Sequence, residues 1–382
     1  MSPGGRRISD SSGDAANPAI TMDYVFLGNT GLKVSTLCLG TMTFGEVVGP
    51  LAQCSEATAG AILDRFVAAG GNFIDTADVY QKGESERILG RWLARNAALR
   101  PRLVIATKCR GAVDAASAGP NDVGLSRSHV LQAVEDSLAR LQTPYVDLMQ
   151  MHVWDAGTPV EETIRALDDL QRAGKIRYWG WSNTTGWQLQ LIVDTCRRLG
   201  IAGPAALQQQ YSLMCRQVEW EVVDVCLREN VGFLPWSPLK GGWLSGKVDR
   251  STGCPEGTRM AWAEATGTST QSGPSFSAFK EDEKTWALID GLKAVAAELG
   301  VSVPQVAIRW LLQRRVVTSV VIGAKSLAQL EDNLGAARIA LSEAHVKTLD
   351  ALSHVPPPYP YEMVNRLQAG RRREVFVDKR GL

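Results

Sequence analysis

The chain has 382 residues, of which 45% are hydrophobic and 21% are charged, so its composition is that of a globular protein and excludes wholesale disorder. Its 41 lysine and arginine residues nearly balance its 40 aspartate and glutamate residues, which gives no electrostatic case for nucleic acid or an anionic membrane as the principal partner. Its seven cysteines are scattered singly, without a CxxC motif, which argues against a disulfide framework or a zinc ribbon and fits a reducing, cytoplasmic compartment.

The amino-terminal segment is rich in Gly, Ser and Asp and lacks the apolar run of a secretory signal. We therefore expect a disordered extension over residues 1–21, a single domain over 22–355 and a tail over 356–382. No apolar run approaches about 18 residues, so no transmembrane helix is predicted.

From Tyr24 onward, a hairpin around Gly28-Asn29-Thr30-Gly31 is followed by apolar runs that alternate with amphipathic segments. The predicted strands are 35–39, 72–75, 103–108, 146–152, 177–182, 206–209, 231–236 and 318–322. The predicted helices are one capped by Ser55 and ending at Gly70, one containing Ile88 to Leu93, one capped by Ser126 and reaching Leu141, then 160–173, 187–199, 218–229 and one from Leu327, with a further pair over 288–299 and 306–312.

Eight strand–helix units indicate a parallel sheet with helical crossovers, and about 300 residues is the size of a (β/α)8 barrel. A doubly wound open sheet is the alternative, but its G-x-G-x-x-G sequence is absent after the first strand. Residues 241–279 have no periodicity and predict a structureless loop, either a functional lid or a mobile segment. The tail beyond Pro356 is predicted to be irregular, with a solvated basic run at 371–373.

The active site of a parallel barrel lies at the carboxyl ends of its strands, so the polar residues that end each apolar run are the candidates. In chain order, these residues are Asp75 and Tyr80, Lys108, His152, Ser182 and Asn183, Gln208, and Trp236 and Ser237.

These strand ends belong to seven short motifs, which we give in chain order. The motifs are Gly71-Asn72-Phe73-Ile74-Asp75-Thr76-Ala77, Gly83-Glu84-Ser85-Glu86, Ala106-Thr107-Lys108, Gly180-Trp181-Ser182-Asn183, Gln208-Gln209-Gln210-Tyr211-Ser212, Trp236-Ser237-Pro238-Leu239-Lys240-Gly241-Gly242 and Ile322-Gly323-Ala324-Lys325-Ser326 to Glu331-Asp332-Asn333. In this order they resemble the aldo-keto reductase superfamily. The insertion after the seventh strand resembles the branch with aryl-alcohol dehydrogenase-like and potassium-channel β-subunit-like members.

The resemblance implies a catalytic tetrad of Asp75, Tyr80, Lys108 and His152. A carbonyl that accepts a hydride needs a proton at its oxygen, and Tyr80 would donate it. The ammonium of Lys108 would lower the pKa of that phenol, and Asp75 would hold the ammonium in place. His152 would hydrogen-bond the carbonyl oxygen. No metal is expected, because the four histidines lack ligand spacing.

The resemblance also implies NADP(H) as cofactor. Its expected binding residues are Gly40, Thr41, Met42, Asp75, Ser182, Asn183, Gln208, Trp236, Ser237, Pro238, Leu239, Gly241, Lys247, Gly323, Lys325, Gln329, Asp332 and Asn333. Trp236 would stack on the nicotinamide, and the loops around Gly241 and Gly323 would hold the pyrophosphate. Lys325 with Ser326 would meet a 2′-phosphate and favour NADP over NAD, although Gln329 replaces an Arg that many relatives carry.

We therefore expect an NADPH-dependent reductase of aldehydes or ketones, with a small-molecule carbonyl substrate, no nucleic-acid or membrane partner, and a homo-oligomer left open. Trp154 and Trp243 favour aryl aldehydes, while Tyr24 and Trp154 fit either the carbonyl pocket or ordinary packing. Two alternatives remain: an NADPH-sensing regulatory subunit with little turnover, and an aldolase in which Lys108 forms a Schiff base.

Overall fold

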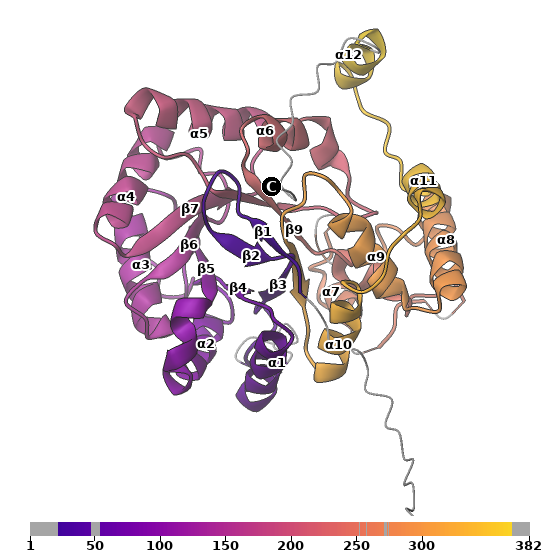
Figure 1. The fold of residues 1–382 in the computed structure, drawn as a ribbon, viewed down its shortest axis with the longest axis horizontal. Coiled ribbons are helices and arrows are strands. Elements are labelled where there is room, and N and C mark those ends of the chain that lie inside the picture. The colour runs from indigo at the N-terminus through magenta and orange to yellow at the C-terminus, as the bar shows by residue number, and fades with distance from the viewer. Residues whose placement is uncertain are drawn as a thin grey trace, which may run out of the picture.

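The computed structural model describes residues 22–46, 54–251, 253–256, 258–270, 273 and 275–368. The extension predicted over 1–21 and the basic run at 371–373 lie outside these residues. The described chain forms an eight-stranded sheet surrounded by helices, with a separate two-stranded hairpin at its amino-terminal end (Figure 1).

The eight strands are parallel and follow one another around the sheet in the order β10-β3-β4-β5-β6-β7-β8-β9. Their bounds are β3 Leu37–Gly40, β4 Phe73–Asp75, β5 Val104–Cys109, β6 Val146–Met151, β7 Ile176–Ser182, β8 Ala206–Gln210, β9 Gly232–Trp236 and β10 Val320–Gly323. The helices that follow β3 to β7 are α1 Glu56–Ala68, α2 Glu84–Arg95, α3 Arg127–Leu141, α4 Val160–Arg172 and α5 Gly186–Leu199. Those that follow β8 to β10 are α6 Val222–Arg228, α7 Arg259–Thr266, α8 Glu283–Leu299, α9 Val303–Leu312, α10 Leu327–Gly335, α11 Glu343–Leu352 and α12 Tyr361–Leu367.

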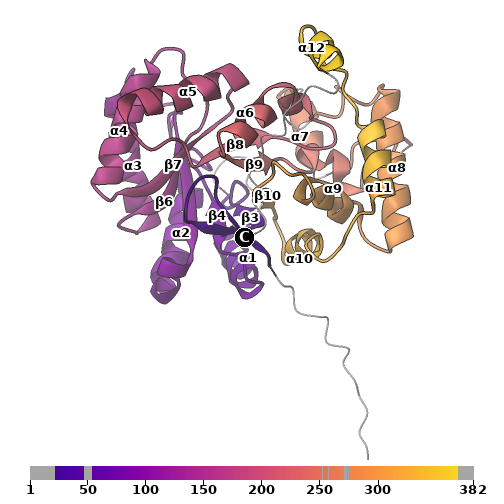
Figure 2. The same ribbon diagram turned by 45° about the horizontal axis from the view of Figure 1, so that its top comes forward.

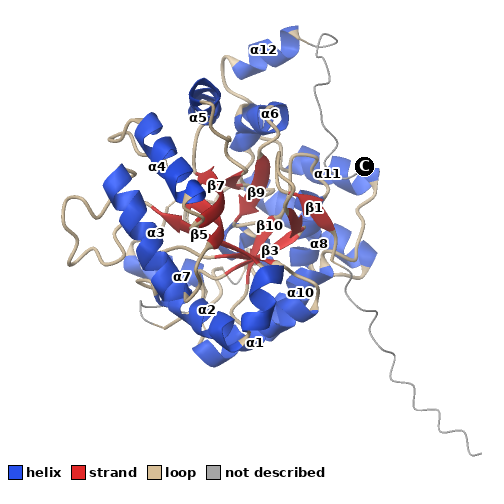
Figure 3. Cartoon of the chain, turned by 60° about the vertical axis from the view of Figure 1, so that its left-hand side comes forward, coloured by secondary structure: helices blue, strands red, loops and turns tan. Residues whose placement is uncertain are grey.

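The two edges of this sheet meet, which confirms the predicted (β/α)8 barrel and excludes the open doubly wound sheet. Phe233 of β9 donates its backbone N–H to Thr318 Oγ1 at 3.1 Å and accepts from the Thr318 N–H at 2.9 Å, just before β10 begins. Helices lie around the outside of the strands (Figures 2 and 3). The helix capped by Ser55 follows the prediction, since its hydroxyl accepts from the Thr58 N–H and its face of Ile62, Leu63 and Phe66 is buried.

The hairpin of β1 (Tyr24–Phe26) and β2 (Lys33–Ser35) covers the amino-terminal end of the barrel. Leu27 packs there in one cluster with Ala205 and Leu234 of the barrel interior. Gly28 has a φ of +55°, and a Cβ at this position would lie 2.3 Å from the carbonyl oxygen of Ala205. Only glycine therefore allows this turn to sit so close to the strands.

The predicted helix over 218–229 is wrong as a continuous element. The structure has a 3-10 helix at Gln217–Trp220 and α6 after it, with a break at Glu221 (φ −146°, ψ −52°). The Glu221 carboxylate accepts the N–H of Gly186 at the start of α5 at 3.2 Å. Tertiary contact with a neighbouring helix thus interrupts a sequence that is periodic along its whole length.

The prediction of a structureless loop over 241–279 is also wrong. This insertion, which we call the β9 insertion, contains a 3-10 helix at Lys240–Ser245 and α7, whose cap Thr258 accepts from the Ala261 N–H. The Glu264 carboxylate accepts the backbone N–H groups of Phe276 and Ser277 at 2.7 and 3.0 Å. One carboxylate therefore ties the end of the insertion back to its helix.

Two smaller differences concern the ends of the domain. Ser35 pairs in the hairpin with Tyr24, so the first barrel strand begins at Leu37 rather than at residue 35. The tail is not wholly irregular, because it contains α12, whose Tyr361 stacks on Trp220 with ring centroids 6.3 Å apart. In the described part of the chain no single helix is long and apolar enough to cross a membrane, although α8 and α9, bent by 95°, pass that test of length and composition as a pair.

Candidate active site

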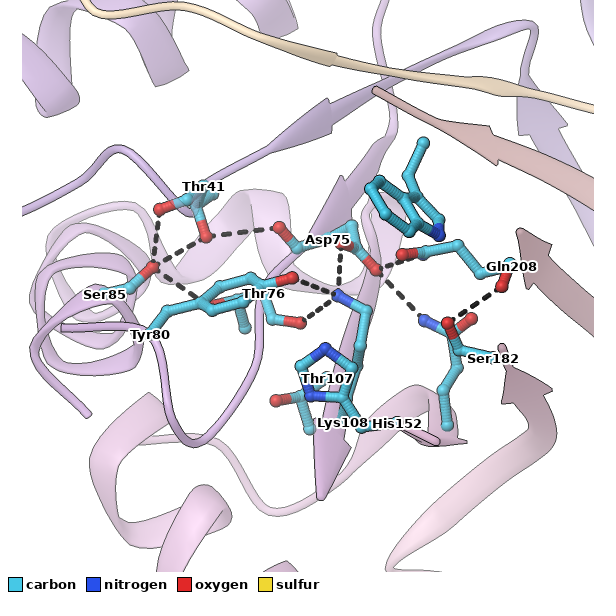
Figure 4. Close-up of polar contacts among 12 residues, drawn as sticks. Thr41, Asp75, Thr76, Tyr80, Ser85, Thr107, Lys108, His152, Ser182 and Gln208 are labelled. Atoms are coloured by element: carbon cyan, nitrogen blue, oxygen red, sulfur yellow. Dashed lines mark hydrogen bonds and ion pairs between the residues drawn. The ribbon is translucent and has the colours of Figure 1, made fainter. Parts of the chain in front are cut away.

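Four side chains from three neighbouring strands meet at the carboxyl end of the barrel (Figure 4). Lys108 Nζ lies 2.6 Å from Asp75 Oδ2 and 3.1 Å from the Tyr80 hydroxyl. The rings of Tyr80 and His152 meet edge to face, with centroids 5.8 Å apart. The structure thus brings together Asp75, Tyr80, Lys108 and His152, which the sequence places up to 77 residues apart.

The Asp75–Lys108 pair is buried and fully hydrogen-bonded. Lys108 has no exposed surface, and its third donor goes to the Thr76 carbonyl at 2.8 Å. Asp75 Oδ1 accepts from Gln150 Nε2 at 3.0 Å and from Gln208 Nε2 at 2.8 Å. Each charge therefore has its partners, as a buried ion pair requires.

Burial alone would lower the pKa of Lys108, but Asp75 and Tyr80 more than offset this, so its pKa lies above the ordinary value and the ammonium is charged. For Tyr80 the balance differs from the prediction. Burial raises the pKa of the phenol and the Lys108 charge only partly opposes it, so the net pKa is above its ordinary value. The predicted lowering effect of Lys108 is present, but desolvation outweighs one ammonium. The phenol consequently keeps its proton at neutral pH.

His152 is a neutral imidazole. Burial, with the positive charges of Lys108 and Arg110, lowers its pKa to about 3. A neutral ring can donate one hydrogen bond to a carbonyl oxygen without carrying a charge itself.

A polar network supports this group from outside, built from residues of the Gly83–Glu86 and Ala106–Lys108 motifs whose structural role the sequence did not predict. Ser85 of α2 hydrogen-bonds Thr41 at 2.8 Å and Thr76 at 3.0 Å (Figure 4). Glu86, the next residue, is fully buried, accepts from Thr107 and pairs with Arg140 Nε at 2.6 Å. These bonds fix the start of α2 against the strands that carry Asp75 and Lys108.

The residues expected to hold the nicotinamide lie beside the tetrad. Asn183, at the end of β7 with φ +56°, donates to the His152 carbonyl at 2.8 Å and accepts from Trp236 Nε1 at 3.2 Å. Ser182 Oγ donates to the Gln208 carbonyl at 2.8 Å. The Trp236 ring is half-buried, and its bond to Asn183 fixes the orientation of the indole.

The loop after β9 forms a tight turn with unusual backbone dihedrals. Ser237, Lys240, Gly241 and Gly242 all have positive φ, at 55°, 47°, 63° and 115°. The turn is closed by its own hydrogen bonds: the N–H groups of Lys240 and Gly242 donate to the Ser237 and Leu239 carbonyls at 2.9 and 3.0 Å, and that of Gly241 donates to Ser237 Oγ at 3.3 Å. Non-glycine residues adopt a positive φ only at a cost. Pro238 is buried and Leu239 half-buried within the same turn.

Within the loop after β10, side chains hold the loop itself. Asn333 Nδ2 donates to the Gly323 carbonyl at 3.1 Å, and Gln329 Oε1 accepts the Lys325 N–H at 2.9 Å. Asp332 accepts instead from Ser302 and Gln305 at 2.6 and 2.9 Å, which directs it toward α9.

The remaining expected cofactor residues lie around the same rim with differing exposure. Gly40 ends β3, and Thr41 donates its backbone N–H to the Asp75 carbonyl at 2.9 Å. Met42 is exposed, and Lys247 is exposed beyond the 3-10 helix of the β9 insertion.

Two of the aromatic candidates are in the wrong place for a carbonyl pocket. Trp243 is buried against Phe276 and Trp286, with its indole N–H bonded to the Ser275 carbonyl at 2.7 Å. Tyr24 belongs to the hairpin at the opposite end of the barrel. Trp154 alone remains near the mouth, half-buried and 5.8 Å from the ring of the exposed Trp187.

Three charged residues near the tetrad escaped sequence reasoning. Asp78 is 1% exposed, and neither of its carboxyl oxygens has a hydrogen-bond partner in the described structure. Arg110 follows β5 directly, and Arg259 begins α7 close enough for its charge to be felt at Tyr80. For Arg259, only the folding of α7 across the mouth reveals this proximity, whereas Arg110 could have been found by counting two residues beyond Lys108.

Comparison with known proteins agrees with this architecture. The family model described as the aldo/keto reductase family matches residues 36–354. The chain belongs to this family. It is 35% identical over 336 residues to the uncharacterized oxidoreductase YrpG of Bacillus subtilis, covering 86% of this chain and 95% of that protein. It is also 35% identical over 317 residues to a probable voltage-gated potassium channel subunit beta of Arabidopsis thaliana, covering 82% and 91%.

A third relative is the norsolorinic acid reductase of Aspergillus flavus, 31% identical over 344 residues, covering 88% of this chain and 82% of the relative. The chain is therefore an oxidoreductase of the aldo/keto reductase family, built on a (β/α)8 barrel. The family generally uses NAD(P)H and acts on small-molecule carbonyl compounds.

Proposed function

We propose that this protein reduces aldehydes or ketones to alcohols with NADPH, using Tyr80 as the proton donor. The observation that carries the proposal is the phenol of Tyr80, held 3.1 Å from a buried ammonium and in edge contact with a neutral imidazole. A protonated phenol beside a fixed positive charge is suited to give its proton to an oxygen that becomes negative.

In this mechanism the carbonyl oxygen lies between the Tyr80 hydroxyl and the His152 ring. The cofactor supplies a hydride to the carbonyl carbon. As negative charge develops on oxygen, Tyr80 transfers its hydroxyl proton there, and Lys108 stabilises the phenolate that remains. Asp75 keeps the ammonium in place, and water returns a proton to Tyr80.

The residues at the rim fit a dinucleotide. The tight turn from Ser237 to Gly242 lies in the loop after β9, where a barrel commonly binds phosphate, and Trp236 offers a ring face to the nicotinamide. Lys325 and Ser326, at the start of α10, support a preference for NADP through its 2′-phosphate. Arg259, a cation near the mouth, would add to the attraction for this anionic cofactor.

A second candidate is favoured by the potassium-channel relatives. An NADPH-sensing regulatory subunit would keep the cofactor site and turn over slowly, and the chain is as similar to the Arabidopsis channel subunit as to the bacterial oxidoreductase. In either role we propose a cytoplasmic protein with one domain over 22–355 and small-molecule ligands, with a homo-oligomer left open.

The two functions differ in turnover. Oxidation of NADPH, followed by its absorbance across a panel of aldehydes, ketones and quinones, should show substrate-dependent rates with kcat above about 1 per second for at least one compound. Tight NADPH binding without turnover on the whole panel, together with a stable tetramer, would instead favour the regulatory subunit.

A further inference from the structure

Arg110 lies next to His152, just beyond the carboxyl ends of β5 and β6. The parallel register pairs Lys108 with Gln150 and Cys109 with Met151, and the His152 N–H continues the ladder to the Cys109 carbonyl at 3.0 Å. The next position along both strands therefore sets Arg110 opposite His152. Arg110 is the first residue after β5, and its charge helps to lower the pKa of His152, so its guanidinium lies near this ring.

The guanidinium of Arg110 makes no hydrogen bond or ion pair with any described residue, and its Nε atom is buried. Arg110 as a whole is half-buried, so its terminal nitrogens remain open to a partner from the mouth, while the unpaired buried Nε is costly. Its carboxylate neighbour is Asp155, whose pKa is lowered by bonds from Thr158, Leu125 and Gly157 and also by the charge of Arg110. Asp155 is thus already satisfied and lies beyond ion-pair distance of Arg110.

The other charges around this part of the mouth do not supply a counter-ion. Asp75 is neutralised by Lys108, and burial raises the pKa of Asp78 to about 8, so this carboxyl is mostly protonated at neutral pH. Arg259 adds a second positive charge, and Lys108 adds none because Asp75 balances it. A neutral carbonyl compound would leave this excess unbalanced, whereas a negatively charged one would balance it.

The expected phosphate-binding loops of the cofactor lie away from Arg110. The residues expected to hold its phosphates follow β9 and β10, while Arg110 follows β5 on another part of the rim. An anion that meets Arg110 must therefore come with the substrate.

We propose that Arg110 is a specificity-determining residue that binds a carboxylate on the substrate, so that the preferred substrates are carbonyl acids. This rests on the proposed reductase function. The planar fork of a guanidinium matches a carboxylate with two parallel hydrogen bonds, and this geometry would place the carbonyl group toward Tyr80 and His152.

The test compares 4-carboxybenzaldehyde with its methyl ester, at saturating NADPH, for the full-length protein and three variants. In Arg110→Met, the ratio of kcat/KM for the acid to that for the ester should fall about 10- to 100-fold, as expected for the loss of a charged hydrogen bond. Arg110→Lys should keep part of this preference, and Arg172→Met, which removes an exposed guanidinium of α4, should keep all of it. An unchanged ratio in Arg110→Met, or a rise in its KM for NADPH of similar size, would overturn the proposal.

Binding separates this proposal from the proposed function. If the protein reduces neither aldehyde, calorimetric titration of the NADP⁺-saturated protein with benzoate still tests Arg110. Benzoate should bind the unmodified protein and bind Arg110→Met at least about 10-fold more weakly. No benzoate binding, or equal binding by both proteins, would contradict the role of Arg110 whatever the turnover.

Discussion

At the scale of single residues, the Asp75–Lys108 ion pair at the mouth of the barrel carries a desolvation cost that apolar side chains would not. A buried ion pair such as Asp75–Lys108 is often no more stabilising than apolar residues of the same size. Here every donor of the ammonium is used, by Asp75, Thr76 and Tyr80. The pair is therefore best explained by the charge it sets beside a phenol, not by its contribution to folding.

Asp78 gives the fold a measurable pH dependence. Burial, and next the charge of Glu86, raises its pKa to about 8, so the native chain holds a proton that the unfolded chain releases near pH 4. The contribution of Asp78 to the free energy of unfolding should fall as pH rises from about 4 to about 8, because this carboxyl binds more protons in the native state over this window. Asp78→Asn should remove this contribution, on the order of a few kcal/mol between the two ends of the window.

Urea denaturation at several pH values measures this effect. Asp290→Asn, an exposed substitution on α8, is the matched control and should keep the slope of the unmodified protein. Equal slopes for Asp78→Asn and the unmodified protein would show that the buried carboxyl is already ionised at low pH.

At the scale of elements, the strands were predictable because apolar runs of fixed length alternate with helical periodicity, and Ser55 and Ser126 both cap the predicted helices. The break at Glu221 and the order within the β9 insertion were not, since each depends on one carboxylate meeting backbone N–H groups far along the chain. Local periodicity carries no information about such contacts.

The hairpin that covers the barrel floor offers a test at this scale. Gly28→Ala should destabilise the protein by more than about 1 kcal/mol, because the new methyl group meets the Ala205 carbonyl oxygen in a positive-φ turn. Gly31→Ala, three residues on, meets no atom within 4 Å and should change stability little. The thermal unfolding midpoint of Gly28→Ala should therefore lie below that of Gly31→Ala. Equal midpoints would mean that the turn moves away from the strands.

At the scale of the whole molecule, closure of the barrel brings residues from separate strand ends together in one site. The sequence motifs predicted which strand ends would meet, and the tetrad residues do meet. They did not predict the raised pKa of Tyr80, which follows from burial, nor Arg259, which depends on the folding of α7. Arg110 was overlooked, although it lies only two residues beyond Lys108. The roles of the cofactor residues remain predictions.

The central claim is that Tyr80 gives its proton to the substrate. Tyr80→Phe removes one oxygen and leaves the ring, so its unfolding midpoint and NADPH affinity serve as controls for folding and cofactor binding. Measured by NADPH oxidation with the best aldehyde of the panel, its kcat should fall at least about 100-fold. A kcat within a few-fold of the unmodified protein would contradict the account.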